Sequence, residues 1–265
     1  MKILVIIPLL VLSMLTTTKH SSTLEDTSKS NDEFYSVESD ISKALQGAWT
    51  SSETNEAGEK IIITTIVMDG YLAETYYHEN SGEFIRTFGG SWTVHENTFS
   101  LTLEFSSSDS TAVGTTKELI FDLKGDTIKF QGSDKIWTRI DSGQKGDLNG
   151  AWLITGRKRD GNMVRRTPGD RKTMKILSST RFQWIAFNTA SGQFSGTGGG
   201  TYKTENGTYT EQIEFFSRDN SRVGAQLSFQ YEVIEKEWHH SGMSSKGAPI
   251  YEIWSPRIMP EKDSK

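Results

Sequence analysis

An internal repeat constrains the fold of this chain more than any other feature. The segment "LQGAW" at residues 45–49 returns as "LNGAW" at residues 148–152, and "SGEF" at residues 81–84 returns as "SGQF" at residues 191–194. Around the second pair an offset of 110 holds without a gap over 44 residue pairs, of which 13 are identical. Each copy has about 100 residues, which is enough to fold alone. We therefore predict two copies of one domain and exclude a solenoid.

Short runs of alternating apolar and polar residues fill both copies. These runs are separated by Gly, Asn, Asp and Ser, and hardly any shows the 3.6-residue period of an amphipathic helix. The pattern predicts an all-β fold of two tandem small antiparallel up-and-down β-barrels, at residues 41–140 and 146–258, followed by a tail at residues 259–265. A single helical turn that begins near Asp40 is expected to lead into the first strand.

The N-terminus has the pattern of a secretory signal peptide. Lys2 precedes an apolar run that is too short for a comfortable membrane span, so we expect a signal at residues 1–18 and a solvated, disordered tether at residues 19–40. The protein is then expected to be secreted or periplasmic, with no integral membrane segment after cleavage. The chain has no cysteine, which excludes disulfides, and its net charge of -5 disfavours nucleic acid as a partner.

Both copies open with Gly-x-Trp, ending at Trp49 and Trp152, and close with a strand that carries Arg139 or Arg257. This arrangement resembles the calycins, the group that contains lipocalins and fatty-acid-binding proteins. The second copy is similar to lipocalin-like domains of secreted bacterial proteins whose biochemical role is uncharacterised. The resemblance implies that an arginine closes each barrel by lying over the tryptophan of the first strand, Arg139 over Trp49 and Arg257 over Trp152.

The stretch "SGQFSGTGGGTY" at residues 191–202 places four glycines within five positions. Only Gly199 and Gly200 are shared with the first copy. A phosphate cradle needs a helix after the glycines, whereas a strand, an Asn-Gly turn and another strand follow here. We therefore reject a phosphate site and predict a bend or bulge in a strand that curves around a small barrel.

One strand of the second copy carries an unusual carboxylate. Simple alternation predicts that Glu211 faces the barrel interior, where the first copy has Leu101. The same alternation predicts the remaining inward residues as Tyr209, Ile213 and Phe215 in the second copy and Phe99, Leu103 and Phe105 in the first. Glu104 and Glu214 are then expected on the outer face, in solvent. A buried carboxylate needs a partner, water or a ligand, or must take up a proton.

We predict that the second barrel binds a small hydrophobic or amphipathic molecule and that the first barrel is mainly structural. The candidate ligand-binding residues are Trp184, Tyr209, Glu211, Phe229, Trp238 and His240. A basic segment at residues 156–172 could recruit an anionic headgroup, although such a segment is usually a solvated hairpin. In the alternative interpretation the aromatic residues only fill the barrel, and an internal Tyr or Arg satisfies Glu211.

Two other function classes stay open. The protein could be an enzyme in which Glu211 acts as acid or base, or a module that binds a glycan or a partner protein. Glu74, Tyr76 and His78 alternate on one face of a first-copy strand, which fits either acid–base chemistry or an outward polar face. The sequence shows no paired catalytic carboxylates, triad or metal cluster, so we predict no catalytic residue, no metal and no cofactor.

Overall fold

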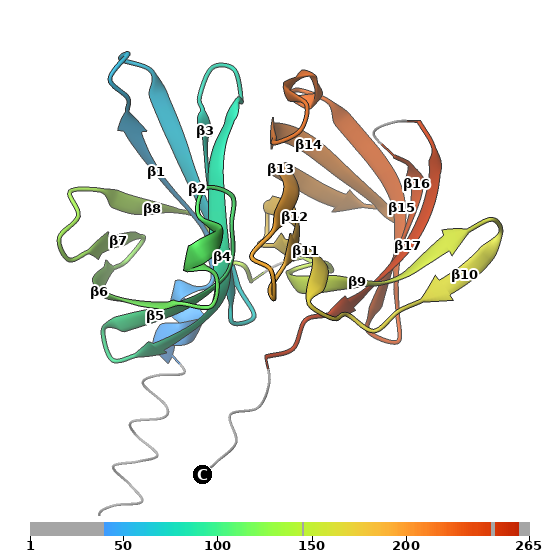
Figure 1. Ribbon diagram of the computed structural model, residues 1–265, viewed down its shortest axis with the longest axis horizontal. Helices are drawn as coiled ribbons and strands as arrows, with labels where there is room; N and C mark the ends of the chain where they lie inside the picture. The colour runs from blue at the N-terminus through green and yellow to red at the C-terminus, as the bar shows by residue number, and fades with distance from the viewer. Residues whose placement is uncertain (1–39, 145, 245–246, 260–265) are drawn as a thin grey trace, which may run out of the picture. The chain divides into compact units, whose positions relative to one another are not determined.

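A computed structural model describes residues 40–144, 146–244 and 247–259. These residues belong to one compact unit that contains two closed eight-stranded antiparallel barrels in tandem, as the sequence predicts (Figure 1). The predicted signal peptide and residues 19–39 of the predicted tether lie outside the described residues. Within the described part, residues 40–45 form a helix, and no helix is both long and apolar enough to cross a membrane.

In the first barrel each strand pairs with the next along the chain, and β1 and β8 pair to close it. Its strands are β1 (Gly47–Thr54), β2 (Lys60–Met68), β3 (Tyr71–His78), β4 (Phe84–His95), β5 (Thr98–Ser106), β6 (Thr116–Lys124), β7 (Thr127–Phe130) and β8 (Ile136–Asp141). A short 3-10 helix, η1 (Ser110–Ala112), lies between β5 and β6.

The second barrel repeats this order and is closed by pairing of β9 with β17. Its strands are β9 (Gly150–Arg159), β11 (Arg171–Leu177), β12 (Arg181–Asn188), β13 (Phe194–Glu205), β14 (Thr208–Phe216), β15 (Gln226–Ile234), β16 (Glu237–Met243) and β17 (Pro249–Pro256). The 3-10 helix η2 (Asn220–Arg222) follows β14. An extra strand, β10 (Asn162–Arg165), pairs only with β9 and forms the basic hairpin.

The tryptophan of each first strand is anchored in the same way. The indole N–H of Trp49 donates to the carbonyl of Leu45 at 2.9 Å, and the indole N–H of Trp152 donates to the carbonyl of Leu148 at 2.9 Å. A buried indole needs such an acceptor, because an unpaired donor inside the protein is costly. The repeated "L-x-G-A-W" segment thus encodes one local structure twice.

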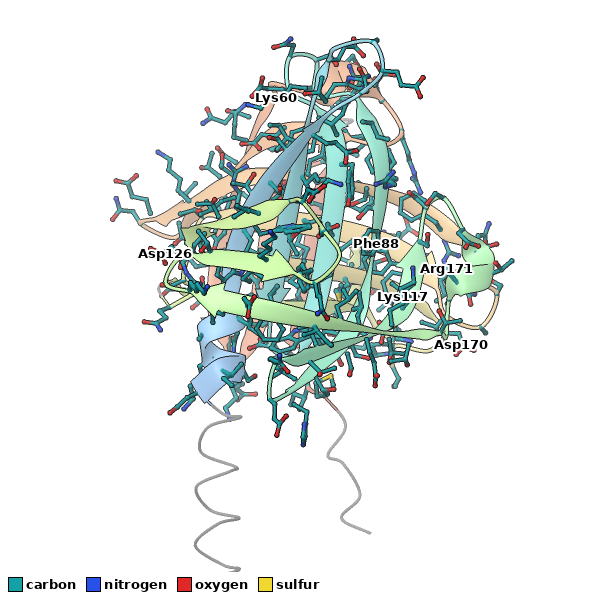
Figure 2. The ribbon with its side chains drawn as sticks, turned by 90° about the vertical axis from the view of Figure 1, so that its left-hand side faces the viewer. Lys60, Phe88, Lys117, Asp126, Asp170 and Arg171 are labelled. Carbon is teal, nitrogen blue, oxygen red and sulfur yellow. The ribbon has the colours of Figure 1, made fainter. Side chains whose placement is uncertain are left out.

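Arg139 closes the first barrel. Its guanidinium lies over the Trp49 ring, with Cζ 3.9 Å from the ring centroid, and donates to the carbonyls of Gln46 and Ala44. It also pairs with Asp126, on the β6–β7 turn labelled in Figure 2. A planar cation can stack on indole and still bond to several backbone carbonyls, so this one side chain joins the last strand to the helix and to the first strand.

The second barrel departs from this arrangement, and the expectation that Arg257 lies over Trp152 is wrong. The Arg257 guanidinium lies 3.9 Å from the centroid of Tyr71 in the first barrel and donates to both carboxylate oxygens of Glu104, at 2.7 and 2.6 Å. Trp152 packs instead against Trp238. A bidentate carboxylate and an aromatic face from the other copy are together a stronger partner than indole alone.

A β-bulge changes which residues face the interior. The register shifts between Gly199 and Gly200, so that Glu214 is an extra residue opposite them. A side chain on Gly200 would lie 2.1 Å from the Gln212 carbonyl oxygen, and its φ of +155° also favours glycine. The predicted bend at the glycine stretch is therefore present. Beyond it Phe216, and not Phe215, lines the second barrel.

The prediction that Phe105 and Phe215 face the barrel interiors is thus wrong. A matching register shift between Gly89 and Gly90 turns Phe105 outward. Phe105 packs against Phe187 with ring centroids 5.1 Å apart, and Phe215 packs against Tyr77 at 5.1 Å. These pairs join the two barrels, because in each one ring comes from each copy.

Glu104 and Glu214 are likewise not simply solvated. Glu104 binds Arg257, as described above, and Glu214 binds Arg181 and accepts from the Tyr77 hydroxyl at 3.1 Å. Bulge residues that a single barrel would expose to water are used here for contact between the copies.

We expect Trp49 and Arg139 to be energetically coupled. Trp49→Ala should lower the free energy of unfolding by roughly 3 to 5 kcal/mol, because it empties a fully buried site. Arg139→Ala should cost less, and the double variant should lose less than the sum. The matched pair, Trp152→Ala with Arg257→Ala, should be close to additive. Chemical denaturation of the six variants measures both cycles, and equal coupling in the two barrels would contradict the assignment.

Candidate functional site

The second barrel contains a cavity of about 730 Å³. Its lining combines aromatic and aliphatic side chains with charged ones. The lining residues include Arg157, Lys175, Trp184, Glu211, Ile213, Phe216, Arg218, Asp219, Arg222, Phe229, Ile250, Glu252 and Trp254. Three of the predicted ligand-binding residues line this cavity, namely Trp184, Glu211 and Phe229. The other three, Tyr209, Trp238 and His240, lie in the adjoining core and do not line it.

A glycine lets two walls of this cavity pack closely. Strand β13 has Gly198 where the corresponding strand of the first barrel has Phe88, and Phe88 lines the first barrel's own cavity of about 350 Å³. A side chain on Gly198 would lie 2.7 Å from both Trp184 and Phe216, whose rings pack edge to face. The glycine stretch therefore serves two purposes, since it forms the bulge and lets the rings of Trp184 and Phe216 pack against the backbone.

Glu211 is satisfied by a lysine. The Lys175 ammonium donates to Glu211 Oε1 at 2.9 Å, and both side chains are 6% exposed. This partner is neither the Tyr nor the Arg considered from the sequence. A buried ion pair adds little stability over well-packed apolar residues, but loss of one partner leaves a charge alone in the interior. The pair is therefore a fixed element of the site.

Aromatic rings surround the Lys175 ammonium. Its Nζ lies 4.9 Å from the ring centroid of Tyr209, 4.7 Å from that of Trp238 and 5.3 Å from that of Trp254. The negative faces of aromatic rings attract a cation at such distances, and more strongly when water is excluded. Tyr209 and Trp238, predicted as ligand-binding residues, thus contact the internal cation.

Next to this pair lie His240 and Glu252. His240 Nδ1 is 3.6 Å from Glu252 Oε2, and Arg157 donates to Glu252 Oε1 at 2.5 Å. Burial lowers the pKa of His240, and the charge of Lys175 lowers it further, so the ring is neutral at neutral pH. Burial alone would raise the pKa of Glu252, but His240, Arg157 and Lys175 together lower it to about 2.

Charged residues also line the outer part of the cavity. Arg222 pairs with Asp219 at 3.3 Å, and Arg157 is held by Glu252. Arg218 donates to the backbone carbonyl of Ser195. Within the described residues no carboxylate forms an ion pair with Arg218, so its positive charge is available to a ligand.

Sequence reasoning missed Lys175, although a signal was present. The segment "TMKIL" places one lysine within an apolar run on the strand next to Trp184, and alternation puts that lysine on the same face as the barrel interior. An inward lysine and an inward glutamate on different strands of one small barrel predict an ion pair.

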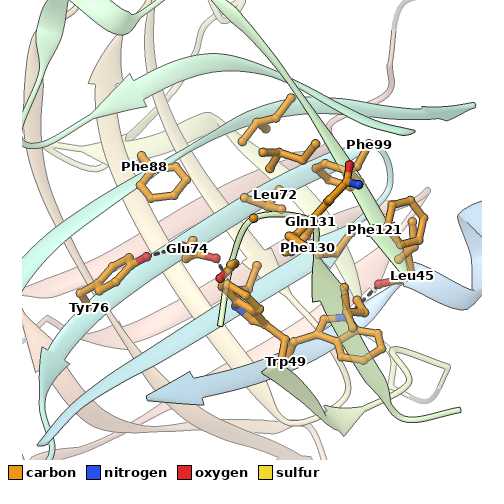
Figure 3. Close-up of a pocket in the computed structure, with 18 residues that line it drawn as sticks. Leu45, Trp49, Leu72, Glu74, Tyr76, Phe88, Phe99, Phe121, Phe130 and Gln131 are labelled. Atoms are coloured by element: carbon orange, nitrogen blue, oxygen red, sulfur yellow. Dashed lines mark hydrogen bonds between the residues drawn. The ribbon is translucent and has the colours of Figure 1, made fainter. Parts of the chain in front are cut away.

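The first barrel also buries a carboxylate. Glu74 lines the 350 Å³ cavity together with Tyr76, as Figure 3 shows, so the outward polar face considered from the sequence is wrong for both residues. Thr65 and Tyr76 donate to the Glu74 carboxylate, each at 2.8 Å. His78 lies near Glu59 at the end of β3 and does not line the cavity.

Comparison with known proteins finds a family similarity over the second barrel. Residues 147–264 match the family described as "Domain of unknown function (DUF4488)". No curated protein matches the chain. In the described part of the chain, no group of three or more His, Cys, Asp or Glu side chains is arranged to hold a metal ion.

Replacement of Glu211 tests the interior ion pair. Glu211→Leu, which restores the first-barrel residue, should cost roughly 3 to 5 kcal/mol of stability, because it leaves the Lys175 charge unpaired in the interior. The double variant Lys175→Met with Glu211→Leu should recover most of the loss. Denaturant unfolding of both variants provides the measurement, and a stable Glu211→Leu single variant would contradict the ion pair.

Acidification tests the neutral state of His240. In the unfolded chain His240 takes up a proton below its ordinary pKa of 6.5, whereas in the folded protein it does so only at lower pH. The free energy of unfolding should therefore fall as the pH is lowered from about 7.5 to about 5.5. His240→Gln should reduce that fall, as urea unfolding at the two pH values would show. An unchanged pH dependence in the variant would indicate an ordinary His240.

Proposed function

We propose that the second barrel binds a small amphipathic molecule. The observation that carries this proposal is the cavity of about 730 Å³ with aromatic walls, which lies within the usual size range of small-molecule sites, roughly 300 to 1,000 Å³. Trp184, Phe216 and Trp254 would contact the apolar part of the ligand. The Gly-x-Trp motif of both copies and the stacking of Arg139 on Trp49 in the first barrel resemble lipocalins and support the same class of function.

The charges around the cavity favour an anionic group on the ligand. The Lys175–Glu211, Arg157–Glu252 and Arg222–Asp219 pairs are each neutral, so the charge of Arg218 is left over. Arginine binds carboxylate, sulfate and phosphate groups through its planar set of donors. We expect the anionic headgroup to bind Arg218 and the apolar body of the ligand to pack against the aromatic walls of the cavity.

Binding accounts for the geometry better than acid–base catalysis. An acid or base must be free to exchange a proton with a bound substrate, and Glu211 is instead engaged by Lys175. We further propose that binding takes place outside the cytoplasm, on the basis of the signal-like residues 1–18. N-terminal sequencing of the exported protein tests that part, and an intact N-terminus would contradict it.

A fluorescent amphipathic anion, 8-anilinonaphthalene-1-sulfonate, tests the site. Wild-type protein should bind the probe with enhanced fluorescence. Gly198→Phe, which introduces the first-barrel residue, should abolish that binding because the new ring would push Trp184 and Phe216, two walls of the cavity, out of their positions. Arg218→Gln should weaken it about tenfold, the effect of losing one charge-assisted hydrogen bond.

Lys203→Gln is the matched control, because Lys203 is an exposed cation that does not line the cavity. It should bind the probe as the wild type does. Thermal unfolding confirms that each variant is folded. Probe binding that survives Gly198→Phe would contradict the proposed site, and equal effects of Arg218→Gln and Lys203→Gln would contradict the role of Arg218.

A further inference from the structure

The interior of the first barrel is a mostly apolar chamber that contains a carboxylate. Among the residues that the structure describes, Glu74 is the only Asp, Glu, Lys, Arg or His that lines the cavity of about 350 Å³. Its other walls are mostly aromatic and aliphatic, and include Trp49, Leu72, Phe88, Phe99, Phe121 and Phe130 (Figure 3). A lone carboxylate in such surroundings is costly unless a partner or a proton neutralises it.

The partners of Glu74 within the chain leave this requirement unmet. Thr65 and Tyr76 each donate one hydrogen bond, whereas a carboxylate can accept about four. Among the described residues no basic side chain forms an ion pair with Glu74. The charge of Arg86 and the Trp137 indole both lower the pKa of Glu74, but burial outweighs them. The Arg86 guanidinium lies 3.8 Å from the centroid of the Tyr76 ring and does not line the cavity.

In the second barrel, the buried carboxylate does have a cationic partner. There the carboxylate of Glu211 binds the Lys175 ammonium, which aromatic rings surround. Lys175 on β11 pairs with Trp184 on β12. At the corresponding place in the first barrel, Thr65 on β2 pairs with Glu74 on β3. The first barrel thus has threonine at the lysine position, and its buried carboxylate, Glu74, takes the place of Trp184 and not of Glu211.

We propose that the first barrel binds a small apolar amine, whose ammonium group pairs with Glu74. The ligand would supply the cation that Lys175 supplies in the second barrel. Its hydrocarbon part, aromatic or aliphatic, would fill the space among the Phe and Trp rings. This site is separate from the one proposed in the second barrel and takes a ligand of opposite charge.

Access and electrostatics fit an amine. Leu119, Gln131 and Ser133 also line the cavity, and Leu119 is 38% exposed, so the chamber reaches the surface beside β6 and the β7–β8 loop. Burial raises the pKa of Glu74 despite the hydrogen bonds that it accepts. A nearby ammonium group would lower that pKa again, so amine binding and loss of a proton from Glu74 are linked.

Calorimetry with three probes of one shape tests the proposal. Phenethylamine, 2-phenylethanol and 3-phenylpropanoate share a phenyl ring and a short chain, and differ in the charge of the end group. Wild-type protein should bind the amine at least tenfold more tightly than the alcohol and should not measurably bind the carboxylate. Equal affinity for amine and alcohol would overturn the proposal, and this comparison needs no variant.

Variants then locate the binding. Glu74→Gln keeps the size and polarity of the side chain but removes its charge, so amine affinity should fall at least tenfold while alcohol affinity stays unchanged. Leu101→Trp, which fills the first cavity, should abolish amine binding. Gly198→Phe, which displaces two walls of the second cavity, should leave it intact. Amine binding that survives Glu74→Gln, or that is lost in Gly198→Phe, would overturn the assignment, whatever the outcome for the anionic probe.

Discussion

A carboxylate inside an apolar barrel must be neutralised, and this constraint organises the interiors of both copies. The second barrel meets it with Lys175, which is held between Glu211 and aromatic rings. The first barrel has Thr65 at the corresponding place, so Glu74 accepts hydrogen bonds from hydroxyl groups and has no ammonium partner among the described residues. Burial therefore raises the pKa of Glu74. One duplicated fold therefore has two different interiors, because the compensating cation is present in one copy and absent from the described residues that line the cavity of the other.

The same duplication explains how space is made for a ligand. Glycine pairs at the bulges of β4 and β13 let neighbouring backbones approach closely and turn one phenylalanine of each copy outward. Those outward rings pack between the barrels, so part of the hydrophobic core lies outside the barrel interiors. At corresponding positions, Gly198 lets Trp184 and Phe216 pack closely as walls of the second cavity, whereas Phe88 itself lines the first. Stability and cavity volume are thus set by different faces of the same strands.

The sequence predicts the architecture well because the repeat and the alternation of apolar residues are local signals. Both barrels follow from them, whereas the placement of Arg139 over Trp49 follows from the resemblance to calycins. Arg257 could not be placed in this way, because its partners Tyr71 and Glu104 belong to the other copy and no local pattern links them. The inward assignments of Phe105 and Phe215 failed for a related reason: alternation holds only up to a bulge.

The candidate site was predicted in part. Trp184, Glu211 and Phe229 line the second cavity, but Tyr209, Trp238 and His240 lie in the adjoining core. Alternation along a strand predicts which side chains face inward, but it does not predict how far the cavity extends into the barrel. Infrared titration of the Glu74 carboxyl band, identified as the band lost in Glu74→Gln, tests the central claim directly. The account predicts a midpoint above the ordinary value of 4.5 in the free protein and a lower midpoint with phenethylamine bound. A midpoint at or below 4.5 that the amine does not change would contradict it.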